Sequence, residues 1–226
     1  MKRLIFSLLI SLITISAFAK KDVTKFLGIP VDGTKSEMIK KLKAKGFKST
    51  FYDKEILEGE FNGSEVTIHV VTNNNKVYRI VVADQTHRDE TDIRIRFNKL
   101  CEQFENSPKY QAIYENSRIS ESEDISYETL INNKRYGAIY YQIPENLDRD
   151  SLPSKLLNIC SKKYALEQLA NPTPEIEADL DNITKDYMID LYSKKPVWFI
   201  ISEQYGKYYI VMYYDNEYNK ANGEDL

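Results

Sequence analysis

The sequence predicts an α+β protein in which antiparallel β-hairpins and a meander pack against amphipathic helices, in two loosely similar halves. Strand patterns occur in pairs joined by short turns, and helix patterns lie between these pairs, which is unlike the regular strand–helix alternation of parallel sheets. The 226 residues are 42% hydrophobic and 29% charged. A chain of this size and composition forms one or two globular domains and is neither a disordered tail nor a small disulfide scaffold.

The first half, residues 20–115, is expected to form an α-β-β-β-α unit. Thr34 and Glu37 have the spacing of a capping box, in which a hydroxyl and a carboxylate each bind a free backbone amide at the start of a helix. Gly46 suits the left-handed conformation that ends a helix. The sequence therefore predicts a helix between Thr34 and Gly46.

A three-stranded meander is expected after this helix. Asn62-Gly63 predicts a type I′ turn between strands 56–61 and 65–72, because both residues tolerate a positive φ. A third strand follows over 77–83. Apolar residues then recur at helical spacing over 89–106, and we expect this helix to close the first unit.

The second half, residues 116–226, is expected to form a β-β-α-α-β-β unit, and the sequence leaves open whether it shares one sheet with the first. Its expected elements are strands 126–131 and 136–143, a helix containing Cys160, a helix over 175–192, and strands 197–203 and 207–214.

The register of the last hairpin is open at this point. A two-residue turn at Tyr205-Gly206 would place Trp198 opposite Tyr213. A three-residue turn with a bulge at Gly206 would place Trp198 opposite Met212 instead, because a shift of one residue exchanges the two faces of a strand.

Residues 1–19 are expected to form a secretory signal peptide. Lys2 and Arg3 precede an apolar run over 4–18, and Ala17 and Ala19 provide the small residues that precede cleavage. A membrane anchor is the alternative, but the run is shorter than the roughly 20 residues that span a bilayer. No Cys lies near the cleavage point, so we expect an exported protein, periplasmic or secreted, that is not a lipoprotein and has no stable membrane span.

Two cysteines in an exported chain raise the question of a disulfide. Cys101 falls on the apolar face of the 89–106 helix, and Cys160 falls on that of a later helix. An oxidising compartment makes a Cys101–Cys160 bridge a candidate, which would stabilise the fold by about 3–4 kcal/mol. The alternative is that both are small buried residues with free thiols.

The sequence contains no nucleophile elbow, phosphate-binding glycine loop, dinucleotide fingerprint or HExxH zinc motif. It has two His and eight Gly, so common catalytic residues are scarce. The acidic face of the 175–192 helix lacks the glycine and the terminal Glu of a calcium loop. We therefore predict no catalytic residue, no metal site and no cofactor. The net charge of −3 also argues against a nucleic-acid partner.

Tyrosine is the residue type in clear excess, with 17 in the chain. Aromatic side chains on a buried sheet face pack the core, whereas on an exposed face they give a protein or a sugar a stiff contact surface. The candidate binding residues are Trp198, Tyr209, Tyr213 and Tyr140, from the last and the middle hairpins.

Two stretches resemble a family of exported, uncharacterised proteins of Gram-negative gut bacteria. They are FLGIPVDG over 26–33, which runs into the first helix, and the tyrosine-rich ending over 205–219. This resemblance spans the chain after the leader and implies no activity. Residues 26–83, a helix preceded by glycine and followed by a meander, are more loosely similar to small envelope-assembly and β-lactamase-inhibitor-like modules. This similarity favours a binding role.

We therefore expect a non-catalytic protein-binding module of the cell envelope. One alternative is a carboxylate-dependent envelope hydrolase acting on glycans, which requires a pocket with two carboxylates about 5–9 Å apart. A second is a carbohydrate- or small-ligand-binding protein, in which Trp198 and neighbouring tyrosines would line an open groove. Under these hypotheses the partner is an envelope protein or a glycan. The sequence does not indicate an oligomeric state.

Overall fold

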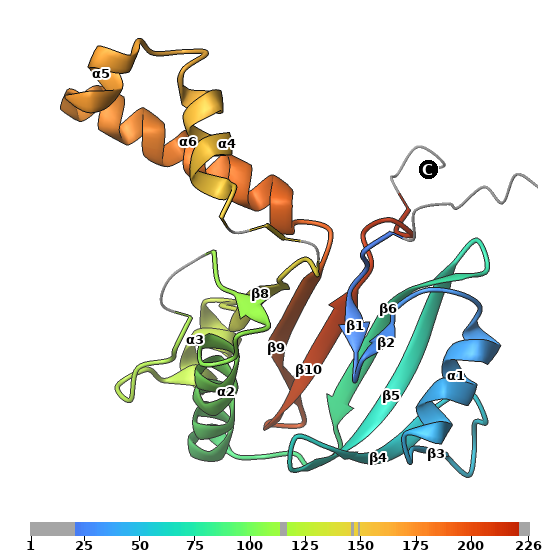
Figure 1. The fold of residues 1–226 in the computed structure, drawn as a ribbon. Helices are drawn as coiled ribbons and strands as arrows, with labels where there is room; N and C mark the ends of the chain where they lie inside the picture. Colours follow the sequence, from blue (N-terminus) through green and yellow to red (C-terminus); the bar gives the residue numbers. More distant parts are fainter. Residues whose placement is uncertain (1–20, 114–116, 146, 149, 222–226) are drawn as a thin grey trace, which may run out of the picture.

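The structure is a computed structural model that describes residues 21–113, 117–145, 147–148 and 150–221 (Figure 1). The expected signal peptide, residues 1–19, lies outside the described residues, as does the expected boundary at Asn116. The described chain forms six helices with antiparallel sheets of eight and two strands. The predicted α+β class with antiparallel strands is confirmed.

The larger sheet has the strand order β3-β4-β5-β6-β10-β9-β8-β7. Its strands are β3 (Lys48–Ser49), β4 (Leu57–Phe61), β5 (Ser64–Asn73), β6 (Lys76–Asp84), β7 (Tyr110–Gln111), β8 (Gly137–Gln142), β9 (Pro196–Gln204) and β10 (Lys207–Asp215). A separate hairpin consists of β1 (Lys25–Phe26) and β2 (Ile29–Pro30). The helices are α1 (Lys35–Ala44), α2 (Glu90–Glu105), α3 (Ile125–Ile131), α4 (Leu152–Cys160), α5 (Leu166–Ala170) and α6 (Pro174–Tyr192).

Local signals in the first half give the predicted elements. The Thr34 side chain accepts a hydrogen bond from the Glu37 amide, and the Glu37 carboxylate accepts one from the Thr34 amide, which completes the capping box of α1. Asn62 and Gly63 have φ values of 51° and 70°, as the turn between β4 and β5 requires. The predicted 89–106 helix is α2, with Asp89 as its N-cap.

The pairing of β6 with β10 joins the two halves of the chain into one sheet. Ile80 lies opposite Tyr214, and Val82 lies opposite Met212, in an antiparallel register that covers most of both strands. The last strand of the chain is therefore inserted next to the last strand of the early meander. We call this pairing the central seam.

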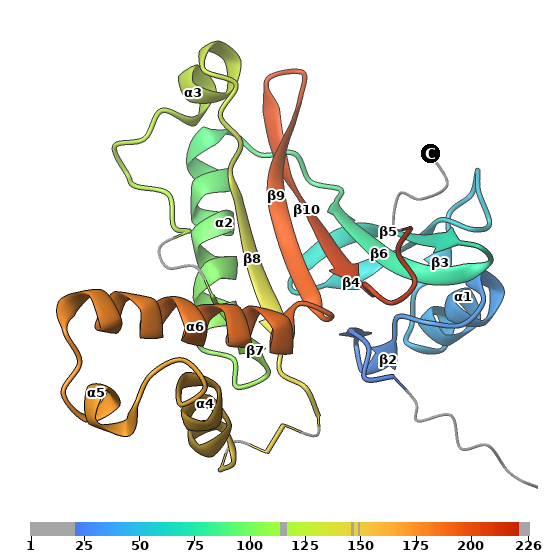
Figure 2. The same ribbon diagram turned by 90° about the horizontal axis from the view of Figure 1, so that it is seen from above.

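Helices α1 and α2 pack on the same face of the sheet, α1 over the early meander and α2 over the C-terminal strands (Figures 1 and 2). Alternate residues of the strands point toward these helices and are buried, as expected for a sheet with one covered face. The largest fully buried side chains of this core include Phe26, Phe97, Phe199, Met38, Leu42, Leu57, Ile68 and Ile80.

The predicted strand over 126–131 is wrong, because these residues belong to helix α3. Asp124 accepts a hydrogen bond from the Tyr127 amide at 2.8 Å and so caps the helix. The Glu90 carboxylate accepts another from the Ile125 amide at 2.9 Å. Asp124 is a typical N-cap residue and indicates a helix. The β-branched and aromatic residues after it favour a strand instead, which explains the wrong prediction. Strand β8 consequently pairs with β7 and β9.

Helices α4, α5 and α6 form an arm between β8 and β9, although these two strands are direct neighbours in the sheet. The arm extends away from the sheet and its covering helices (Figure 1). The predicted helices around Cys160 and over 175–192 correspond to α4 and α6, whereas the short helix α5 was not predicted. Among the described helices, none has both the length and the apolar character to cross a membrane.

The segment after the β1–β2 hairpin and the segment after β10 lie against each other. The Asn216 side chain donates a hydrogen bond to the Val31 carbonyl at 2.7 Å, and Asn219 donates one to the Asp32 carboxylate at 2.8 Å. Both asparagines follow β10, and both acceptors follow the β1–β2 hairpin. These contacts hold the N-terminal hairpin at the end of the central seam.

We predict that Phe199→Ala lowers the free energy of unfolding by about 3–5 kcal/mol, because it leaves a cavity in the core. The Phe199 side chain is 0% exposed, and its ring centroid lies 5.1 Å from that of Phe97 and 5.7 Å from that of Phe104. Urea unfolding measures the change. Tyr52→Ala serves as the control, since Tyr52 is 91% exposed; equal losses for the two variants would contradict the assigned core.

Candidate functional site

The face of the sheet opposite α1 and α2 is the first candidate surface. No helix of the described chain covers this face in either view (Figures 1 and 2). Because strand side chains alternate, the residues between the core positions of β6, β10 and β9 point to this side. Its apolar centre, called here the open face, consists of Val81, Ala83, Tyr209, Val211, Tyr213, Trp198 and Ile200, most of which are half-buried.

A stacked aromatic pair lies at the centre of the open face. Trp198 is opposite Tyr213, and their rings are nearly parallel with centroids 3.9 Å apart. This settles the register that the sequence left open, in favour of the two-residue turn. Tyr205 and Gly206 have φ values of 53° and 71°, which match a type I′ turn.

An ion pair across the central seam supports the aromatic pair. Arg79 of β6 donates two hydrogen bonds to the Asp215 carboxylate of β10, at 2.6 Å and 2.7 Å. The Trp198 indole donates a third to Asp215 at 3.0 Å. The hydrogen bond to Asp215 raises the pKa of Arg79. The guanidinium also lies 5.0 Å from the Tyr213 ring centroid, so three strands contribute to one network.

The predicted binding residues do not all lie together. Tyr209 is on the open face and stacks on His87, with ring centroids 4.8 Å apart. Tyr140 points to the opposite face, where it is 2% exposed and stacks on Phe104 at 4.7 Å. Tyr140 therefore does not belong with the other three residues. Its position in β8 points its side chain to the core side of the sheet, opposite Val197.

An acidic border flanks the open face on β4 and β5. Glu58, Glu60 and Glu65 are exposed, and alternation places them on the same side as Tyr213. Glu60 lies directly opposite Glu65 in the sheet. Like charges at such positions destabilise a sheet, and no ion pair of these three carboxylates is found within the described chain. Lys48 of β3 lies directly opposite Glu58, whereas Glu60 and Glu65 face each other, so the fold keeps a like-charge pair beside its aromatic surface.

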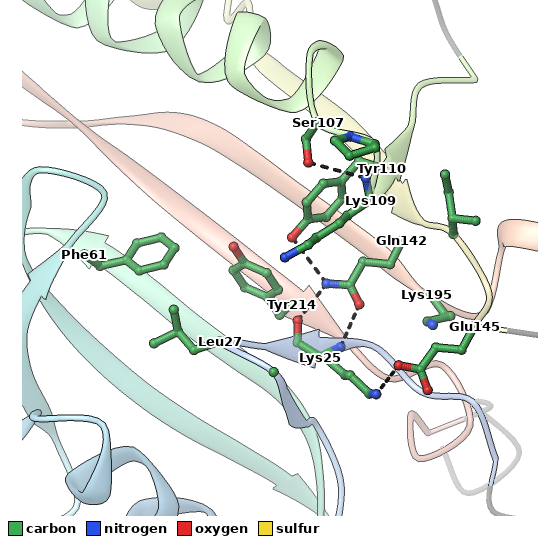
Figure 3. A pocket seen from close by; sticks show the side chains of 13 residues that line it. Lys25, Leu27, Phe61, Ser107, Lys109, Tyr110, Gln142, Glu145, Lys195 and Tyr214 are labelled. Atoms are coloured by element: carbon green, nitrogen blue, oxygen red, sulfur yellow. Dashed lines mark hydrogen bonds and ion pairs between the residues drawn. The ribbon is translucent and has the colours of Figure 1, made fainter.

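A cavity of about 710 Å³ on the other side of the sheet is the second candidate site. The β1–β2 hairpin, the segment after α2, the end of β8 and Lys195 surround it, and Tyr214 of β10 contributes to its wall (Figure 3). With Phe61 of β4, six separate parts of the chain meet here, so no local motif in the sequence could predict the site.

A glutamine organises the polar wall of this cavity. Gln142 accepts a hydrogen bond from the Lys25 amide at 2.7 Å and donates to the Lys25 carbonyl at 2.6 Å. It also donates to the Tyr110 hydroxyl at 3.3 Å. Burial raises the pKa of Tyr110 and, more strongly, that of Tyr214, so both hydroxyls stay neutral. The wall is thus fixed by internal hydrogen bonds, with the Lys25 and Glu145 side chains in an ion pair at its edge.

The cavity does not have the two carboxylates of a glycan hydrolase. Glu145 is the one carboxylate among the described residues that line it, and its partner Lys25 neutralises it. Elsewhere in the described chain, no cluster of three or more His, Cys, Asp or Glu is arranged to hold a metal ion.

Both cysteines are buried and free in the structure, so the candidate Cys101–Cys160 bridge is not formed. Cys101 lies in α2 under the sheet, whereas Cys160 ends α4 in the arm. Burial raises the pKa of the Cys101 thiol to about 11, which leaves it protonated and unreactive near neutral pH. This environment is that of a core residue and not that of a nucleophile.

Comparison with protein families, with curated proteins and with solved structures finds no match to this chain.

Sequence reasoning identified Trp198, Tyr209 and Tyr213 but missed Arg79 and Asp215. Asp215 stands two residues after Tyr213, so strand alternation alone places both on one face. Its partner Arg79 depends on the pairing of β6 with β10, which joins residues far apart in the sequence. That pairing has no local signal.

We predict that Asp215→Asn lowers the free energy of unfolding by about 1.5–3 kcal/mol, because it removes charge-assisted hydrogen bonds and leaves Arg79 without its anion. Asp215 is 2% exposed. Glu217→Gln is the matched control, since the Glu217–Lys220 pair is more exposed and should contribute less than about 1 kcal/mol. A loss no greater than that of the control would show that the network does not stabilise the seam.

We also predict that the folded protein has two free thiols that react slowly. A thiol reagent should modify neither cysteine rapidly in the native chain and both after unfolding in guanidinium chloride, because burial protects them. The measurement is the number of thiols titrated without reductant. Modification of neither cysteine after unfolding would instead establish a disulfide.

Proposed function

We propose that the chain is an exported, non-catalytic binding protein that attaches to a partner protein of the cell envelope through its open face. The observation that carries this proposal is an aromatic surface, with no described helix above it, whose side chains are held rigid by the Arg79–Asp215–Trp198 network. Rigid aromatic residues bind protein partners at low entropic cost. The leader pattern over residues 1–19 supports export.

The charge around the open face favours a partner with basic residues. Glu58, Glu60 and Glu65 border the aromatic centre without ion-pair partners in the described chain. A complementary surface would place apolar groups over Tyr213 and Lys or Arg side chains over these carboxylates. Such a partner would also relieve the repulsion between Glu60 and Glu65.

The surface suits a protein better than a sugar. Tyr213 covers one side of the Trp198 ring, and the Arg79 guanidinium lies 5.4 Å from the Trp198 ring centroid. The indole is therefore held inside a network and is not presented flat for stacking on a sugar. The apolar residues around it continue over three strands, as expected for a protein interface with a hydrophobic centre and a polar rim.

Site-specific crosslinking in the native envelope tests the proposal. A photo-reactive amino acid at position 209, on the open face, should crosslink one protein partner. The same group at position 95 should not, because Ile95 is 60% exposed on α2, on the covered side of the sheet. Crosslinking to that partner only from position 95, or from neither position, would overturn the proposal.

Glu60→Lys separates binding from folding. It replaces a repulsive cross-strand pair by an attractive one, so the free energy of unfolding should rise by up to about 1 kcal/mol. The crosslink from position 209 should nevertheless weaken by about tenfold, because the basic partner meets a like charge. Glu167→Lys on the arm is the charge control and should leave crosslinking unchanged. A crosslink unaffected by Glu60→Lys would contradict the basic character of the partner.

A further inference from the structure

The cavity in Figure 3 has an apolar end and a charged end. Phe61 and Leu27 lie together at one end, while Glu145 and Lys195 lie at the other. Between them are Tyr110 and Gln142, whose polar groups are bonded to each other and to the β1–β2 hairpin. An elongated site of this kind fits a molecule with an apolar body and a polar head.

The middle of the cavity has one ammonium group without an ion-pair partner (Figure 3). Lys25 pairs with Glu145, and Lys195 pairs with Asp22 at 2.6 Å. Lys109 is an exposed residue that has neither an ion pair nor a side-chain hydrogen bond within the described chain, and its side chain extends into the cavity near Tyr110. One positive charge therefore remains in a protein whose formal net charge is −3. A single excess charge matches a monoanion.

The apolar end contains a residue in an unfavourable conformation. Leu27 occupies the turn between β1 and β2 with φ of 50°, where Gly, Asn or Asp is usual. Its side chain is nevertheless 39% exposed, so the core gains little from it. Neither the backbone conformation nor burial in the core explains a leucine at this position. A side chain that covers the apolar body of a ligand would explain it.

We infer that this cavity binds a small amphiphilic carboxylate of the fatty-acid class. The carboxylate lies at Lys109 and forms a charge-assisted hydrogen bond with its ammonium. The hydrocarbon body extends between Leu27 and Phe61, where it is removed from water. This site is on the helix-covered side of the sheet, so it is independent of the open face and of the partner proposed for it.

Titration calorimetry of the purified chain with dodecanoate, below its micelle concentration, tests the inference. We expect saturable binding at one site per chain. Lys109→Gln should weaken binding by about tenfold, because the carboxylate loses its charged donor. Lys99→Gln, at an exposed position of α2 outside the cavity, should leave the affinity unchanged. Dodecanol and dodecyltrimethylammonium should bind at least about tenfold more weakly than dodecanoate.

Leu27→Gly tests the apolar end without damaging the fold. Glycine adopts a positive φ freely, so the unfolding midpoint in urea should be maintained or raised. The affinity for dodecanoate should fall severalfold, because the apolar cover is lost. No binding of dodecanoate, equal binding after Lys109→Gln, or equal binding of the cationic amphiphile would overturn the inference.

Discussion

The pairing of β6 with β10 is the constraint on which the rest of the structure depends. It inserts the last strand of the chain beside the early meander and so makes one eight-stranded sheet from both halves. The core side of this seam places Tyr214 in the cavity wall. Its other side brings Arg79 to Asp215 and supports the aromatic pair. The cavity and the open face therefore lie on opposite sides of the same strand pair.

The seam also explains how a sheet can leave one side without a helix. The open face is composed of side chains that stabilise one another across strands, as the stacked rings of Trp198 and Tyr213 do. The buried ion pair between Arg79 and Asp215 fixes these rings. Such a surface needs no covering helix to be ordered, and its apolar area remains available to a partner.

Sequence reasoning succeeded where the signal is local and failed where it is distant. The Thr34 capping box, the Asn62-Gly63 turn and the helical spacing around Cys101 are all contained within a few residues, and each gave the correct element. The 126–131 segment failed because strand-favouring side chains opposed the helix cap at Asp124. Sheet order, the burial of Tyr140 and the cavity formed by six segments depend on tertiary pairing, which a single sequence does not encode locally.

Native-state hydrogen exchange tests the seam most directly. If β6 and β10 hold the two halves together, their paired amides exchange only on global unfolding, with the same free energy and the same denaturant dependence as the α2 core. The opposite result would be an opening in which the amides between β6 and β10 exchange at lower free energy while α2 and β9 stay protected. In that case the halves would be separate units, and neither the open face nor the cavity would have the rigid framework described above.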